Sequence, residues 1–466
     1  MPKKAAASRA RCEHSVLQFS STKELGYKQP TWDYRVAAIT PSGSGNVKLT
    51  DGRTQREANS PTTFPAPLLL PNDDLALDPK YPPQSYRSWL RNGNRNEVTP
   101  KRRTIYLAAP PVIEAEVKFV EEWARPKQNG ASKIKQPNSA DVLEYLKAFY
   151  HGMPVKMLPS DVLHFTSEVN DLALKGSKSR PNQQITGLST KSKYGCKGIR
   201  SRSTPDGIYS HQLQQTDLLD AAIWALPNDA YAILLLVEHD VFEDEEDEFC
   251  CGRAYGGSRV AVISTARYNP ALDKIQYIER DHAWPASHCE SYLKACLPSP
   301  EAKAFQRTDD PGVLVVPTKP YPNNPIQEAV SAHARLPSLE GKRSPAVLSG
   351  LWLGRVCRTV SHELGHCLGM DHCVYYACSM QGSASIVEDA RQPPYLCPVD
   401  LAKVLKATEA NILERYKALL AFCEQHKDIH LFSGYGAWIL ERLKQLGDAG
   451  GPEEEAVEQE VIWISD

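Results

Sequence analysis

The feature that most constrains the fold is an uninterrupted apolar run, AYAILLLV, at residues 230–237. It is the longest purely apolar run in the chain, and it is far shorter than the roughly twenty residues that a membrane-spanning helix needs. A short continuous run of this kind is typical of a strand that is buried on both faces of a sheet. We therefore expect a β-sheet with further elements packed on each side of it.

Other segments of the sequence predict the further strands and helices that accompany this strand. Apolar alternation predicts strands, and apolar residues three and four positions apart predict helices. The expected strands cover residues 104–109, 161–166 and 258–268, and the expected helices cover 112–125, 140–150, 217–226, a stretch from about 349, 400–426 and 434–446. Strands interspersed with helices in this way indicate the α/β class.

The remaining segments are rich in proline, glycine, serine or charge. They predict a largely disordered N-terminal segment and an acidic tail on either side of one folded unit. The expected boundaries are 1–65, 66–450 and 451–466, with a linker at 126–139, an exposed loop at 171–206 and a long insertion at about 297–345.

Composition excludes several classes of function. The 466 residues carry a formal net charge of −2, which argues against nucleic acid or a membrane surface as a partner. The 12 cysteines are too sparse for a disulfide scaffold, and the chain lacks an N-glycosylation sequon. These features favour an intracellular, cytoplasmic or nuclear location, in which clustered thiols more often bind metal. We expect a monomer.

The motif HELGHCLGMDH combines metal ligands with a base. His362 and His366 are four residues apart, so a helix places both imidazoles on one face. Gly369 accepts the left-handed conformation that ends a helix, which lets His372 supply a third nitrogen. Three imidazoles leave one tetrahedral position of a zinc ion for water, as in catalytic sites. Glu363 lies beside that water and can act as a general base.

Chance does not explain this motif. With 13 histidines and 27 glycines in 466 residues, the full spacing arises by coincidence in roughly 3 of 100,000 such chains. The helix also has a second use, because an apolar stripe can face the core while the histidines project elsewhere. The stripe consists of Val356, Val360, Leu364, Cys367 and Leu368.

The same stretch resembles the extended zinc motif of the metzincin metallopeptidases. The cysteine directly after the third histidine resembles the archaemetzincin family in particular, as do segments at 69–90 and 252–268. The resemblance implies a zincin (metzincin-like) fold, that is, a twisted mixed β-sheet with backing helices and an active-site helix. It also implies zinc on the three histidines, Glu363 as base, and Met380 in a turn that forms an apolar floor beneath the ligands.

Members of that family also hold a structural zinc through four cysteines. Cys373, Cys378 and Cys397 fall in register with the family pattern, whereas Asp400 occupies the fourth position. Zinc accepts a carboxylate ligand, so a second zinc ion is one interpretation. A repacked turn with three free thiols is the other, and the sequence does not choose between them.

Several further residues are interpreted as structural rather than as catalytic or metal-binding. An exposed acidic loop is expected at 243–248, and a turn at the adjacent Cys250 and Cys251. His239 is expected to be a hydrogen-bonded structural histidine, and Tyr375 and Tyr376 receive no catalytic role. A weak metal-binding alternative concerns Asp281, His282, His288 and Cys289.

Two functions remain in view. The first is a zinc-dependent metallopeptidase that hydrolyses peptide or protein substrates, with residues 258–268 as the strand nearest the substrate, able to pair with an extended peptide. The alternative is a zinc-bound scaffold or peptide-binding protein with little hydrolytic activity, motivated by the missing fourth cysteine and the long insertion. Intact Glu363 argues against the alternative, because a structural site has no need of a base.

Overall fold

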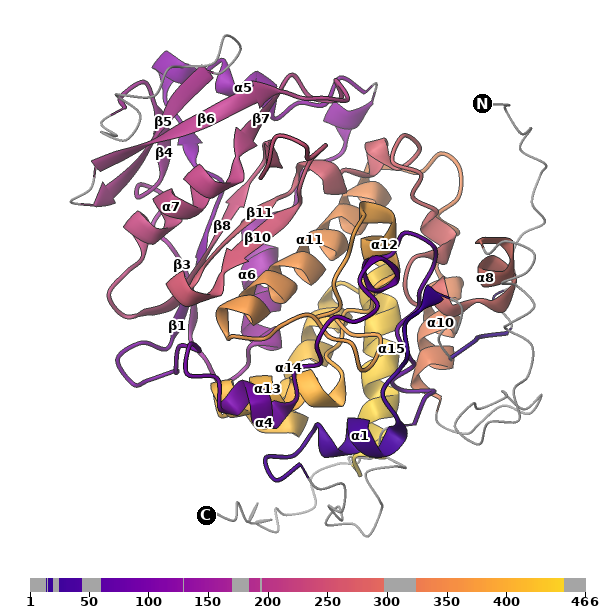
Figure 1. Ribbon diagram of the computed structural model, residues 1–466. Helices are drawn as coiled ribbons and strands as arrows, with labels where there is room; N and C mark the ends of the chain where they lie inside the picture. Colours follow the sequence, from indigo (N-terminus) through magenta and orange to yellow (C-terminus); the bar gives the residue numbers. More distant parts are fainter. Residues whose placement is uncertain are drawn as a thin grey trace.

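The protein is a mixed α/β structure built from two β-sheets and a group of helices (Figure 1). The computed structural model describes residues 14, 16–19, 25–43, 60–128, 130–169, 184–192, 195–296 and 324–447. Within these ranges, no helix combines the length and hydrophobicity that a bilayer span requires. The α/β class expected from the sequence is confirmed, while the finer zincin description stays a prediction.

The first sheet contains the apolar run that opened the sequence argument. Its strand order is β10 (Gly252–Tyr255), β11 (Val260–Ser264), β8 (Ala230–Val237), β1 (Thr104–Ala108) and β3 (Val155–Met157). All pairs are parallel except that of β10 with β11. Every residue of β8 is buried. Leu234 and Leu236 belong to one core cluster and Ile233 and Leu235 to another, which confirms that both faces are covered.

The second sheet corrects one expectation. Its order is β2 (Val112–Ile113), β4 (His164–Thr166), β5 (Gln184–Ser192), β6 (Gly195–Ser203), β7 (His211–Gln214) and β9 (Asp240–Phe242). The long exposed loop expected at 171–206 is thus wrong for β5 and β6; residues 170–183 lie outside the described residues. Thr186 and Thr190 occupy buried positions on either side of Leu188. Because these buried residues are polar, the sequence of β5 lacks the alternation of apolar and polar residues that predicts a strand.

One helix joins the two sheets. Helix α7 (Gln215–Ala225) contacts β11 of the first sheet and both β5 and β6 of the second. Leu218, Leu219 and Ala222 are fully buried there, in the same core cluster as Val262 of β11. The apolar side chains of α7 therefore hold the second sheet against the first, on the side away from the large helical core.

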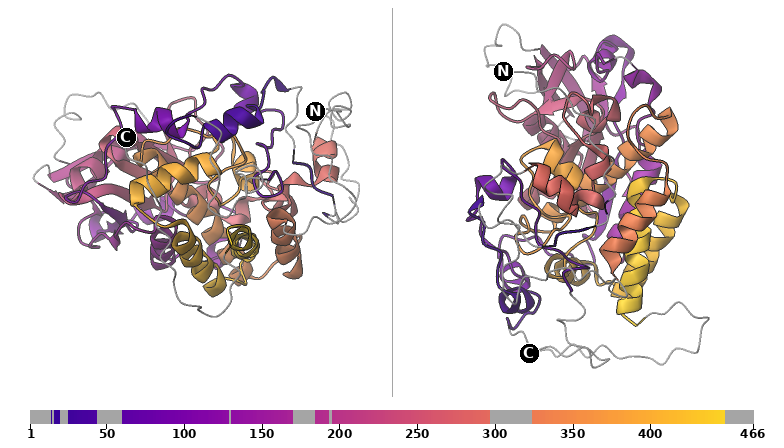
Figure 2. Two further views of the ribbon diagram at one scale, coloured as in Figure 1. Left: turned by 90° about the horizontal axis from the view of Figure 1, so that it is seen from below. Right: turned by 90° about the vertical axis from the view of Figure 1, so that its right-hand side faces the viewer.

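The helical core covers the other face of the first sheet. It contains α6 (Ser139–Phe149), α10 (Pro325–Arg335), α11 (Pro345–Cys367), α14 (Ile412–Gln425) and α15 (His430–Gln445). Helices α10 and α15 lie side by side (Figure 2). Helix α10 lies within the segment expected as an insertion, 297–345, and its Ile326 and Ala329 are buried; residues 297–323 lie outside the described residues.

The N-terminal expectation also needs correction. Part of the segment expected to be disordered, residues 1–65, forms α1 (Trp32–Ala37), which is capped by the Thr31 side chain. Phe64 is fully buried and contacts the rings of Tyr376, Tyr395 and Trp438. Aromatic contacts hold Phe64 on the folded body, although the local composition is that of an unfolded chain. Residues 1–13, 15, 20–24 and 44–59 lie outside the described residues.

Short elements complete the chain. Two expected helices are broken: residues 112–125 contribute strand β2 before a brief helix, and Glu409, with a φ of +59°, divides 400–426 into two helices. The remaining helices are α3 (Asp74–Leu77), α4 (Tyr86–Leu90), α5 (Val120–Trp123), α8 (Glu290–Cys296), α12 (Ile386–Arg391) and α13 (Pro398–Thr408). The 3-10 helices are η2 (Ala115–Val117), η3 (Ala131–Lys133), η4 (Gly256–Ser258), η5 (Ala266–Tyr268), η6 (Pro270–Leu272), η7 (Arg280–His282) and η8 (Ala286–His288).

Candidate metal centre

Helix α11 carries the first two histidines and ends where the sequence predicts. Gly369 follows its last turn with a φ of +79°. The Gly369 amide donates to the carbonyl of His366 at 2.9 Å, and the Met370 amide donates to that of Gly365 at 3.1 Å. This pair of bonds is the Schellman arrangement, which reverses the chain direction after a helix. The reversal carries His372 back toward α11.

The three histidines converge. Their ligand atoms lie within 4.8 Å of one another, and the Nε2 atoms of His362 and His366 are 3.1 Å apart. Nδ1 of His362 lies 2.7 Å from the carbonyl oxygen of Ser379, and Nδ1 of His366 lies 2.7 Å from that of Met370. Because a carbonyl can only accept, each Nδ1 carries the hydrogen, and each Nε2 lone pair is free for a metal.

These positions fit a zinc ion. Zinc–nitrogen bonds of about 2.0–2.1 Å in a tetrahedron place two ligand nitrogens about 3.3 Å apart, close to the observed separation. Burial lowers the pKa of His362 far below its usual value and that of His366 to about 4, with the neighbouring histidines adding to both shifts. Both rings are therefore neutral at physiological pH, which is the form that binds a metal.

Glu363 lies in the same cleft as the three histidines. The cleft has a volume of about 1200 Å³ and is lined by all four side chains. Glu363 is only 8% exposed, and burial raises its pKa to about 8, an effect that Arg253 opposes. A β-carbon placed on Gly252 of β10 would lie 3.2 Å from Glu363 Oε1. The base candidate thus lies directly against the edge strand.

The position of β10 corrects the expected substrate strand. Residues 258–268 were expected to lie nearest the substrate, but their strand β11 has β10 on one side and β8 on the other. In the described sheet the edge strand at the cleft is β10. Arg253 of this strand is half-exposed and pairs with Glu243 at 3.1 Å. The acidic stretch expected as a solvated loop also contributes cleft residues, including Glu246 and Glu248.

Met380 lies below the histidine turn. Its side chain is fully buried, and a β-carbon placed on Gly365 would lie 2.4 Å from its sulfur. Gly365 stands between Glu363 and His366 in α11, so only a glycine admits the thioether this close to the helix. The placement agrees with the apolar floor that the family resemblance implies.

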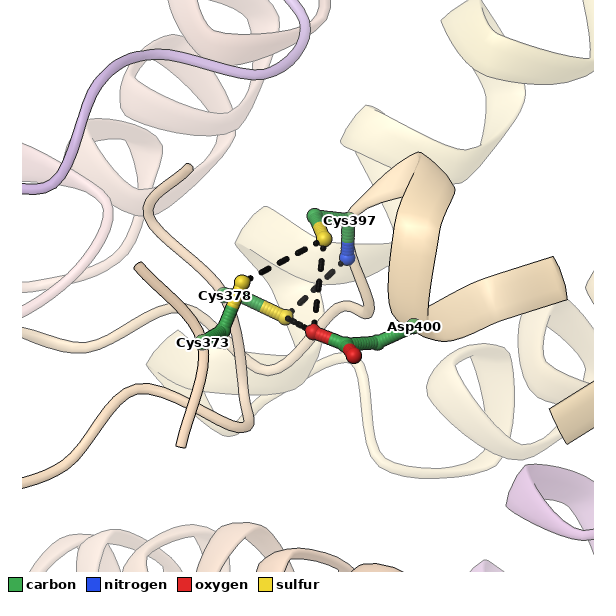
Figure 3. Close-up of side chains that lie close together, drawn as sticks. All are labelled: Cys373, Cys378, Cys397 and Asp400. Carbon is green, nitrogen blue, oxygen red and sulfur yellow. Dashed lines mark hydrogen bonds between the residues drawn. The ribbon is translucent and has the colours of Figure 1, made fainter. Parts of the chain in front are cut away.

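The second predicted cluster also comes together (Figure 3). The sulfur atoms of Cys373 and Cys397 are 3.5 Å apart, and Asp400 Oδ2 lies 3.3 Å from Cys378 Sγ and 3.4 Å from Cys397 Sγ. All four side chains are buried. A tetrahedral zinc with bonds of about 2.3 Å to sulfur and about 2.0 Å to oxygen needs sulfur–oxygen separations near 3.5 Å. The geometry fits an ion held by three thiolates and one carboxylate.

The features set aside in the sequence remain outside both clusters. His282 stacks on Tyr292, while His288 Nε2 lies 3.4 Å from the carbonyl oxygen of Ala66. His239 Nε2 lies 2.9 Å from the carbonyl oxygen of Val120, which confirms a hydrogen-bonded structural histidine. Across the described residues, the three-histidine and the three-cysteine clusters are the groups of three or more His, Cys, Asp or Glu residues whose ligand atoms converge.

Comparisons with known proteins find similarity to one family of peptidases. Residues 347–406, which contain the histidine motif, match peptidase family M54. Archaemetzincin-2 of Rattus norvegicus is 30% identical over 47% of this chain and 54% of its own length, so that alignment spans about half of the relative. Archaemetzincin-2 of Macaca fascicularis is 23% identical over 84% of this chain and 90% of its own length. These matches support the archaemetzincin family of zinc metallopeptidases.

A solved structure is also similar to this chain. The crystal structure of archaemetzincin from Methanopyrus kandleri is 16% identical, covers 66% of this chain and 98% of its own chain, and gives a TM-score of 0.28.

The sequence did not indicate several residues around the histidine motif. A β-carbon placed on Gly382 would lie 2.1 Å from Asp74 Oδ2 and 2.7 Å from His372 Nδ1. Gln84 binds the turn before His372, and Lys403 binds Asp400. The one available signal was Lys403, a charged residue among the apolar positions of its helix. Asp74 and Gln84 lie too far along the chain from their partners to be recognised.

Proposed function

We propose that this protein hydrolyses peptide bonds in peptide or protein substrates, with zinc held by His362, His366 and His372 and with Glu363 as general base. The observation that carries the proposal is the convergence of three neutral imidazole nitrogens beside Glu363 in a cleft of about 1200 Å³. Zinc bound there would polarise the scissile carbonyl and lower the pKa of its water toward neutrality.

The residues of the chain supply the remaining steps. Glu363 accepts the proton of the attacking water and then delivers it to the leaving amine, because a carboxylate within hydrogen-bonding reach can serve both steps. Its burial suits this role, since a base with a pKa near the working pH both takes and returns a proton. The Nδ1 contacts of His362 and His366 hold the two rings in the orientation that a metal requires.

The edge strand supplies a surface for an extended substrate. A peptide can add to β10 through main-chain hydrogen bonds, as a further strand of the first sheet. Gly252 admits the closest approach, because a β-carbon there would crowd Glu363. The substrate backbone would then run past the base and the three histidines together.

Replacing Glu363 with Gln tests this proposal. We expect hydrolysis of a peptide library to fall at least about 100-fold, since general bases contribute about 10²–10⁴-fold. Zinc content should stay unchanged, because the three imidazoles are retained. The matched control is Glu246→Gln, which removes an exposed carboxylate from the same cleft and should retain activity within a few fold. Undiminished hydrolysis by zinc-loaded E363Q contradicts the mechanism.

The same assay separates the enzyme from a zinc-bound scaffold. A metallopeptidase loses activity with a chelator and regains it with zinc, whereas a scaffold shows negligible hydrolysis in both states. Activity that a chelator leaves intact contradicts both functions. The expected monomer is a separate prediction that light scattering tests.

We also propose a second, structural ion at Cys373, Cys378, Cys397 and Asp400. The convergence of these four buried side chains supports it (Figure 3). Metal counting by mass spectrometry should find two zinc ions per chain and one in Cys378→Ser. The control is Cys423→Ser, which changes a buried thiol of α14 outside the cluster. A constant single ion in all three proteins would mean that the thiols are free.

A further inference from the structure

A buried lysine lies behind the cysteine cluster. Lys403 of α13 is only 1% exposed, although lysine is among the residues most rarely buried without a partner. Its ammonium group donates to Asp400 Oδ1 at 2.8 Å and to Gln84 Oε1 at 2.9 Å. The first bond leaves Asp400 Oδ2 directed at the thiols of Cys378 and Cys397. Lys403 therefore fixes which carboxylate oxygen faces the cluster.

The charge of the cluster explains why a cation is needed there. Three thiolates and one carboxylate carry four negative charges, so a divalent ion leaves two uncompensated in a buried place. The positive ammonium group of Lys403 compensates one of these two negative charges from hydrogen-bonding distance. Buried charge is costly unless it is paired and hydrogen-bonded, so this contact stabilises the loaded cluster more than the empty one.

Gln84 links Lys403 to the turn that precedes His372 of the three-histidine cluster. Its Nε2 donates to the carbonyl of Gly369 at 3.0 Å and to Asp371 Oδ2 at 2.8 Å. Its Oε1 accepts from Lys403 and, at 3.2 Å, from the Asp371 amide. Two donors and two accepted bonds use the full capacity of a primary amide. The side chain of Gln84 thus has one fixed orientation, and it clamps the turn immediately before His372.

Together these contacts form a continuous relay between the two clusters. It runs from Asp400 through Lys403 and Gln84 to the turn of Gly369–Asp371, with a hydrogen bond at each step. His372 follows that turn directly. These hydrogen bonds connect Asp400 to the turn before His372 without using a side chain of α11.

We propose that Lys403 and Gln84 are positioning residues that couple the two metal sites. Occupation of the cysteine cluster fixes Asp400, which fixes Lys403 and Gln84, and this in turn holds His372 where it completes the three-histidine site. A metal ion at the cysteines then raises the metal affinity at the histidines. The inference rests on the proposed function, because it requires both sites to bind metal.

The test compares cooperativity of metal binding in full-length chains. Zinc titration against a competing chelator gives the two affinities, and cobalt titration distinguishes the sites, since only the cysteine site shows thiolate-to-cobalt charge transfer. In the parent chain, filling the cysteine site should tighten binding at the histidines. In Gln84→Met, thiolate-bound cobalt should remain, while affinity at the histidines falls about 10–100-fold, the usual effect of removing a partner behind metal ligands.

Matched variants keep the test decisive. Lys406→Met removes an exposed lysine from the same helix and should behave as the parent chain. If Gln84→Met does not fold, Gln84→Asn provides a shorter amide that cannot reach both ends of the relay. The inference fails if the variant with altered Gln84 keeps the parent affinities and cooperativity. A parent chain that binds one ion or none instead contradicts the proposed metal sites themselves.

Discussion

Gly382 offers the sharpest test of the three-histidine site, because it is a glycine packed against a proposed ligand. A β-carbon at this position would lie 2.7 Å from His372 Nδ1 and 2.1 Å from Asp74 Oδ2. Nonbonded heavy atoms pack at about 3.5 Å, so the histidine ring or the backbone of residue 382 has to move by about 0.8 Å. Asp74 can rotate its side chain away, so the contact with His372 decides the outcome.

This displacement is large on the scale of a metal site. Ligand distances have to stay within about 0.2 Å of their ideal values. We therefore expect Gly382→Ala to weaken zinc binding at the histidines at least about 10–100-fold, which corresponds to about 1.4–2.7 kcal/mol. Peptide hydrolysis at limiting zinc should fall in parallel and recover in part when zinc is raised.

Chelator competition measures the affinity, and far-UV circular dichroism checks that the variant is folded. Gly257→Ala is the matched control, because a β-carbon there meets no atom within 4 Å although the residue lines the same cleft. Equal zinc affinities for the two alanine variants would refute the reasoning, since the crowding of His372 would then have no consequence for the metal.

Three further changes test the surrounding structure. Met380→Ala should lower the free energy of unfolding by about 2–5 kcal/mol in chemical denaturation while zinc stays bound. Arg267→Met leaves the fully buried carboxylate of Asp240 unpaired and should cost about 3–5 kcal/mol, part of which Asp240→Asn restores. Burial raises the pKa of Glu388 to about 8, so its ionisation should destabilise the fold progressively as pH rises from about 4.5 to 8; Glu388→Gln should flatten that slope.

The sequence was sufficient where the information is local. Five apolar positions of α11 predicted its buried stripe, and all five are at most 2% exposed. Gly369 predicted the end of the same helix. Both features depend on residues within a few turns, so helix periodicity and C-terminal capping decide them.

The local sequence pattern gave wrong predictions for segments whose structure depends on packing against distant parts of the chain. Strand β5 has Thr186 and Thr190 on its inward face, and a polar inward face is indistinguishable from a loop in the sequence. The buried position of Phe64 depends on packing against residues more than 300 positions later in the chain. Edge and interior strands are also alike in sequence, which is why β11 was expected where β10 lies.

The residues of the candidate site also differ in whether local sequence could predict them. Its proposed metal ligands were recognisable because they lie within one stretch of chain at a spacing that suits a metal ion. Asp74, Gln84 and Arg253 were not recognisable, because each comes from a segment more than 100 residues before the histidines they adjoin. Only the tertiary structure brings such supporting residues to the metal ligands.

One short loop serves both clusters, and this gives a physical reason for their proximity. The Cys373 amide donates to the carbonyl of Met380 at 2.7 Å, closing the loop, and Ser379 within it provides the carbonyl that orients His362. Cys378 accepts from the Cys397 amide at 3.1 Å, which joins the loop to α13. Closing a loop costs conformational entropy, and a metal bound by Cys373, Cys378 and Cys397 would offset that cost. Loss of the ion at the cysteines should then loosen the Ser379 carbonyl, and with it the ring of His362, even though α11 remains folded.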